Sequence, residues 1–85
     1  MIRKTMTVQL TAEQVVRPVA MFVQVAGQFA NRIYVESSDM RINAKSIMGM
    51  MTLGMETGQE LTVSADGPDE EEALARLETF LATGA

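Results

Sequence analysis

Alternating apolar and polar residues predict four strands along this chain. Residues 6–10 alternate in this way, so one face of a strand would be buried and the other would face solvent. Residues 33–35 and 40–42 alternate on either side of a polar turn at 37–39, which predicts a hairpin. The same period returns at residues 61–65 and predicts the last strand.

Apolar residues spaced three and four apart predict helices between these strands. Pro18 suits the first turn of a helix whose apolar stripe lies within residues 19–26, and Gly27 is a suitable stop. Ser46 is a favoured N-cap residue and precedes a short apolar helix over residues 47–53. This second helix is too short to bury all of its apolar residues on one stripe.

The clearest helix follows Pro68. Asp69 and Glu72 have the spacing of a capping box, and an apolar stripe follows within residues 74–81. Five of the eleven acidic residues lie between positions 66 and 72. Because the helix macrodipole favours negative charge at this end, we interpret the acidic cluster as structural.

The predicted order of elements is β-α-β-β-α-β-α, within a single domain over residues 1–85. Strands with one apolar face need a cover, and three helices with one stripe each supply it from one side. The expected fold class is therefore α+β, with a four-stranded antiparallel sheet and three helices on one face.

The composition excludes several kinds of chemistry. The chain has 85 residues and no Cys, His or Trp, so disulfides, thiolate ligands and the commonest general base are absent. Seven Lys and Arg against eleven Asp and Glu give a net charge of −4, which argues against a nucleic-acid or membrane surface. We expect no metal, no cofactor and no enzymatic activity. With no targeting pattern, we expect a cytoplasmic protein that works by presenting a surface.

The first helix carries a cation at its start, where the helix dipole disfavours one. Arg17 directly precedes Pro18. One interpretation is a solvated arginine on a loop. The other is that Arg17 and the free N–H groups of the helix together hold an anion such as phosphate.

The second helix begins with more large apolar residues than one stripe holds. They are Ile47, Met48, Met50 and Met51. Successive helical residues point about 100° apart, so some of these side chains must be exposed. Clustered exposed methionines are typical of adaptable protein-binding surfaces. We assign Met51 and Leu53 to the core, whereas Ile47 and Met48 suit the core or the surface equally.

Ser46 has two interpretations. As an N-cap it accepts a backbone N–H bond worth about 1 kcal/mol and needs no further function. As a phosphorylation site it would receive about −1.5 to −2 charges at a helix N-terminus beside Lys45. Modification would then change the sign of a surface flanked by apolar side chains.

Several of these segments together resemble the HPr family of the bacterial sugar phosphotransferase system. The resemblance lies in the Arg17-Pro18 pair, the helix at residues 22–24, the Asn-Ala-Lys-Ser-Ile-Met-Gly segment at 43–49 and the helix start at 69–74. The 43–49 segment is the specific part, and the likeness runs along essentially the whole chain. It implies the HPr open-faced β-sandwich.

One departure from the family changes the expected function. The family's phosphocarrier histidine precedes the Arg-Pro pair by two residues, and Val15 holds that position. Valine has no atom that accepts a phosphoryl group, so a histidine relay is not expected. A lost carrier histidine with a retained serine is similar to the Crh, or catabolite-repression, branch of the family.

The Crh resemblance implies a phosphorylation switch. Ser46 would be phosphorylated by an HPr kinase/phosphorylase, and the product would bind a LacI-type catabolite control protein as co-repressor. Polar contacts would come from Arg17 and Ser46, with Lys45 beside them. Apolar contacts would come from Ile47 and Met48, and Met51 would extend the patch.

Two other functions remain open at this point. The chain could carry phosphate on Ser46 or Tyr34, although phosphoserine esters do not pass phosphate on readily. It could also be a degenerate interaction or decoy module of the phosphotransferase system, with Ser46 only a helix cap. An exposed edge strand offers a route to a homo-oligomer, which the sequence does not decide.

Overall fold

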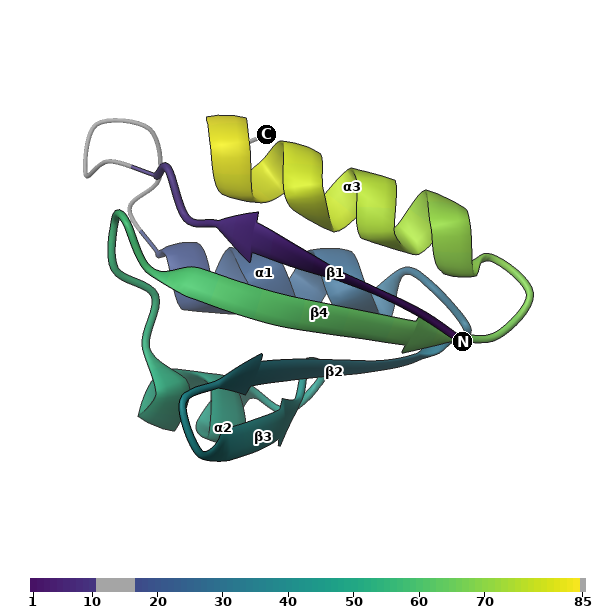
Figure 1. Ribbon diagram of the computed structural model, residues 1–85, viewed down its shortest axis with the longest axis horizontal. Helices are drawn as coiled ribbons and strands as arrows, with labels where there is room; N and C mark the ends of the chain where they lie inside the picture. The colour runs from purple at the N-terminus through teal and green to yellow at the C-terminus, as the bar shows by residue number, and fades with distance from the viewer. Residues whose placement is uncertain (11–16, 85) are drawn as a thin grey trace.

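The computed structural model describes residues 1–10 and 17–84 and contains one four-stranded sheet (Figure 1). Its strands lie in the order β1-β4-β2-β3. They are β1 (Ile2–Thr7), β2 (Arg32–Ser37), β3 (Met40–Asn43) and β4 (Glu60–Asp66). Every neighbouring pair is antiparallel. The strands β1 and β3 therefore form the two edges.

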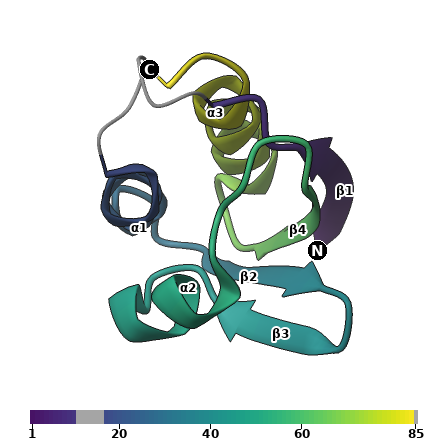
Figure 2. The same ribbon diagram turned by 90° about the vertical axis from the view of Figure 1, so that its left-hand side faces the viewer.

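Three helices lie on one side of this sheet (Figure 2). They are α1 (Pro18–Gly27), α2 (Ile47–Leu53) and α3 (Glu70–Thr83). Helix α3 packs on β1 and β4, α2 packs on β3, and α1 contacts both other helices. The predicted order and the open-faced α+β architecture are confirmed.

The core lies between the helices and the inner face of the sheet, where the alternating residues predicted it. Val35, Leu61 and Val63 are fully buried from the sheet side. Phe22 of α1 and Phe80 of α3 meet them from the helix side, with ring centroids 6.2 Å apart. This contact joins two helices that lie far apart in the sequence.

The outer face of the sheet is polar and carries ion pairs across strands. Glu36 on β2 lies 3.0 Å from Arg3 on β1 and 3.6 Å from Arg41 on β3. The Arg41 guanidinium also lies 4.2 Å from the centre of the Tyr34 ring. Since these charged groups are partly exposed, they add little to stability, and the outer face of the sheet stays in contact with solvent.

Two predicted boundaries differ in detail from the structure. The first strand ends at Thr7 although the alternation continues through buried Val8 and Leu10. Beyond Thr7, the Val8 N–H donates instead to the Gln59 carbonyl, 2.8 Å away, on the loop before β4. In the hairpin, Ser37 still pairs with Met40, so the turn is narrower than the polar run at 37–39 predicted.

Candidate functional site

Ser46 begins α2 as its N-cap residue. Its backbone is extended, and its Oγ accepts a hydrogen bond from the Gly49 N–H at 3.2 Å. The Ser46 carbonyl accepts the first helical bond from Met50 N at 3.0 Å. The predicted cap is therefore confirmed. The residue is exposed, so the capping bond leaves the hydroxyl open to solvent.

The apolar residues of α2 divide between the core and the surface. Met50 is fully buried, whereas Ile47 is 42%, Met48 78% and Met51 66% exposed. Leu53 packs against the core, as predicted. The assignment of Met51 to the core is wrong, because the face that α2 turns toward β3 is taken by Met50. Three large apolar side chains thus lie on the surface next to Ser46.

Helix α1 contributes the other half of this surface. Arg17 is its exposed N-cap residue, directly before Pro18 in the first turn. A hollow of about 380 Å³ separates the start of α1 from α2. Its lining includes Arg17, Pro18, Val19, Ala20, Ile47 and Met51. We call the surface formed by Arg17, Ser46, Ile47, Met48 and Met51 the α1–α2 surface.

The lining of this hollow includes residues that the sequence did not single out. Val19 packs partly against the core, as its place on the apolar stripe of α1 predicts, and it also lines the hollow. Pro18 had been interpreted only as a helix start. Nothing in the local pattern distinguishes these roles, because the hollow exists only where α1 and α2 meet.

Lys45 is held by the fold on the other side of Ser46. Its Nζ donates to the Phe29 carbonyl at 2.6 Å, in the loop after α1. Its backbone N–H donates to Asn43 Oδ1 at 2.9 Å. The ammonium therefore ties the start of α2 to the end of α1, and a partner contact by Lys45 stays a prediction.

The carrier position lies outside the described residues. Val15 and its neighbours Gln14 and Val16 fall within residues 11–16. The expectation that Val15 cannot carry a phosphoryl group therefore stays a prediction from the sequence.

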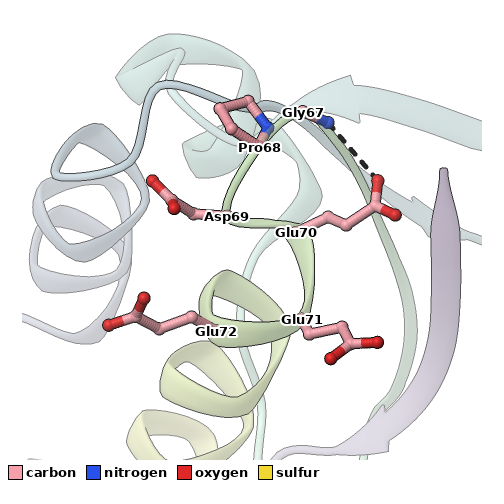
Figure 3. Close-up of a pocket in the computed structure, with 6 residues that line it drawn as sticks. All are labelled: Gly67, Pro68, Asp69, Glu70, Glu71 and Glu72. Atoms are coloured by element: carbon pink, nitrogen blue, oxygen red, sulfur yellow. Dashed lines mark hydrogen bonds between the residues drawn. The ribbon is translucent and has the colours of Figure 1, made fainter.

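The acidic cluster surrounds a second hollow, of about 440 Å³, at the start of α3 (Figure 3). The capping box predicted there is wrong: among the described residues, the Asp69 side chain makes no capping bond. The Gly67 N–H donates to Glu70 Oε2 at 3.4 Å, and the Asp69 N–H donates to Asn31 Oδ1 at 3.2 Å. The Glu70 side chain therefore binds the loop before α3, and Asn31 accepts from the first turn of the helix.

Residues 1–10 and 17–84 contain no group of three or more acidic, His or Cys side chains that would hold a metal ion. Their helices are all too short or too polar to cross a membrane.

Comparison with known proteins shows which family the sequence resembles. The chain matches the family model described as the PTS HPr component phosphorylation site over residues 2–83. It is 41% identical over 81 residues to the HPr-like protein Crh of Bacillus subtilis, and the alignment covers 95% of both chains. The amino-acid sequence thus has a close relative along nearly its whole length.

Solved structures give the same result. An HPr of Thermoanaerobacter tengcongensis is 41% identical with a TM-score of 0.86, covering 95% of this chain and 91% of its own. The crystal structure of Bacillus subtilis Crh, described as a swapped, intertwined dimer, is 42% identical with a TM-score of 0.70, covering 89% and 83%. The family model spans nearly the whole chain, and the identity to Crh is well above the level at which only the fold is shared. The chain therefore belongs to the HPr family, in its Crh branch.

Proposed function

We propose that this protein is a Crh-like regulator switched by phosphorylation of Ser46. An HPr kinase/phosphorylase adds the phosphate, and the α1–α2 surface then binds a LacI-type catabolite control protein as co-repressor. The observation that carries the proposal is the exposed Ser46 hydroxyl beside the exposed side chains of Ile47 and Met48.

The chemistry of the α1–α2 surface supports this switch. Transfer of the γ-phosphoryl group of ATP to Ser46 Oγ replaces the hydroxyl proton with about −1.5 to −2 charges. The phosphate oxygens are acceptors for the Gly49 N–H that the hydroxyl already binds. Arg17 adds a guanidinium to the same surface, where it suits bidentate recognition of phosphate or of a partner's carboxylate.

A histidine relay is not part of the proposal, because the chain contains no histidine. The remaining hydroxyls, including Ser46 and Tyr34, form esters that hold phosphate rather than pass it on. Incubation with enzyme I and phosphoenolpyruvate is therefore expected to leave no transferable phosphate on the protein.

The decoy module is the second candidate, and one observation favours it. The Ser46 side chain already accepts a capping bond, which accounts for a serine at this position without any modification. In this case partners would bind the unmodified α1–α2 surface.

A kinase assay separates the cap role of Ser46 from its role as phosphate acceptor. We expect HPr kinase with ATP to add one phosphate, seen by intact mass measurement. Ser46→Asn keeps a capping oxygen but has no hydroxyl, so this variant should stay folded and unlabelled. Ser38→Ala, which removes an exposed serine from the hairpin turn, should be labelled like the unmodified chain.

Two outcomes would contradict the phosphorylation proposal. One is label on Ser46→Asn, and the other is no label where an ordinary HPr is labelled. If the phosphorylated protein binds the catabolite control protein at least about tenfold more tightly than the unmodified one, the switch is supported. Equal binding of both forms would favour the decoy module.

We also propose that this protein associates with copies of itself. The edge strands β1 and β3 are available for pairing, and the Crh relative forms a swapped dimer. Light scattering of the purified chain would show its mass.

A further inference from the structure

Two thioethers are the most exposed large side chains of α2. Met48 is 78% and Met51 66% exposed, whereas Met50 between them is fully buried. We propose that Met48 and Met51 form an oxidation site at which conversion to methionine sulfoxide weakens partner binding by the α1–α2 surface. The effect on a partner rests on the proposed function, but the chemistry of the site is measurable without it.

The reaction needs an oxidant of the peroxide class, such as hydrogen peroxide. A sulfur lone pair attacks one peroxide oxygen, the O–O bond breaks, and an S–O bond forms. The second oxygen leaves as water after proton transfer. The sulfur loses two electrons and the peroxide gains them, so a flexible apolar side chain becomes a polar one.

Burial directs this reaction to Met48 and Met51 rather than to Met50 within α2. Peroxide must reach the sulfur, and the sulfurs of Met50 and Met6 belong to residues that are 0% and 3% exposed. Oxygen added at Met48 or Met51 faces solvent. Helix α2 keeps its buried anchor at Met50 and its Ser46 cap, so oxidation changes the surface without unfolding the helix.

Oxidation of Met51 acts directly on the hollow between α1 and α2. Met51 lines this hollow together with Arg17 and Ile47. A sulfoxide oxygen accepts hydrogen bonds, whereas a guanidinium is a donor with five N–H groups. The oxidised side chain therefore competes with a partner for Arg17 and makes the apolar lining polar.

The first test maps the oxidation rates of individual methionines. The folded protein is treated with dilute hydrogen peroxide and analysed by peptide mass spectrometry. Met48 and Met51 are expected to react at least about tenfold faster than Met50 and Met6. In denaturant the four rates should converge, because burial is the cause of the difference. Equal rates in the folded protein would overturn the proposal.

The second test uses Met48→Leu/Met51→Leu, which keeps an apolar surface that peroxide does not modify. Peroxide is expected to shorten the retention of the original protein on a hydrophobic-interaction column more than that of the double variant. Met1 and Met21, which are also exposed, remain in both proteins and control for oxidation elsewhere. An equal shift in both proteins would exclude the proposed site.

Partner binding gives the functional readout. Peroxide should weaken binding of the Ser46-phosphorylated protein to the catabolite control protein by about tenfold or more, and methionine sulfoxide reductases should restore it. The double leucine variant should keep its affinity, and unchanged binding of the oxidised original protein would contradict the proposal. If the unoxidised phosphoprotein does not bind, the proposed function fails, while the rate map and the column still decide whether the oxidation site exists.

Discussion

At the scale of single residues, Gly49 connects the packing of α2 to the chemistry of Ser46. A Cβ atom at this position would lie 2.6 Å from Ile42 Cγ2 on β3 and 3.3 Å from Ser46 Oγ. The missing side chain lets α2 lie directly on β3. The Gly49 N–H also donates the hydrogen bond that Ser46 Oγ accepts as the N-cap of α2. One glycine therefore sets both the position of the helix and the environment of the hydroxyl.

We expect Gly49→Ala to destabilise the fold. The added methyl group overpacks against Ile42 and costs about 1–3 kcal/mol, which exceeds the gain of about 1 kcal/mol in helix propensity. Urea unfolding followed by circular dichroism measures the difference. Gly27→Ala is the matched control, because nothing lies within 4 Å of the added atom at the end of α1. Equal stability of the two variants would show that α2 tolerates a side chain at this contact.

At the scale of elements, the start of α3 is held by groups from distant parts of the chain. Gly67 has a φ of 153° and passes so close to Asn31 that a Cβ would overlap its Oδ1, at 2.1 Å. This approach brings Asn31 Oδ1 to the Asp69 N–H. The loop from β4 to α3 is thus anchored by a buried amide that follows α1.

The Met1 ammonium adds an electrostatic contact to the same helix start. It lies 3.3 Å from Glu70 and 3.6 Å from Asp66. Hydrogen bonding and attraction to Glu70 raise the pKa of the ammonium above its usual 8.0. Because the pKa is raised in the folded state, the contact with Glu70 stabilises the fold fully below about pH 8.0, the pKa of the ammonium in the unfolded chain. This stabilisation is lost as the pH rises through the folded pKa.

This contact predicts a pH-dependent effect of Glu70→Gln. The variant should be less stable than the original chain near pH 7, and the difference should shrink as the pH rises through the raised pKa of the ammonium, which then loses its charge. Thermal unfolding across this range measures it, and the effect is small because the ammonium is exposed. Glu71→Gln removes a neighbouring charge from the same helix turn, so its effect should not vary with pH over this range. Parallel pH profiles for the two variants would contradict the assignment.

At the scale of the whole molecule, the α1–α2 surface depends on how the three helices share the sheet. Helix α1 lies between α2 and α3 and reaches α3 through the contact of Phe22 with Phe80. Both rings are fully buried. Loss of this contact would free α1 and with it Arg17 and the lining of the hollow.

We expect Phe22→Ala to cost about 3–5 kcal/mol, a large share of the stability of a small domain. Met48→Ala should change stability by less than about 0.5 kcal/mol, because Met48 is exposed. Denaturant unfolding of both variants tests this contrast. A small loss for Phe22→Ala would mean that α1 is not anchored through its ring, and a large loss for Met48→Ala would mean that Met48 supports the core.

The candidate site was predictable where local chemistry is sufficient. A serine before an apolar run predicted the Ser46 cap, because the capping bond closes within three residues of it. Prediction failed where the partner is distant in sequence. In place of the predicted capping box, the Asp69 N–H donates to Asn31 Oδ1, and the Lys45 ammonium donates to the Phe29 carbonyl.

The sequence alone determined the order of the elements, the sides of the strands that are buried and the absence of any histidine. These follow from the period of apolar residues and from side-chain chemistry, which any conformation of the chain must respect. Only the tertiary structure decided that Met50 is buried while Met51 joins Arg17 at the surface. The reason is that a short helix carries apolar residues on several faces. The positions of β3 and α1 determine which of these faces is covered.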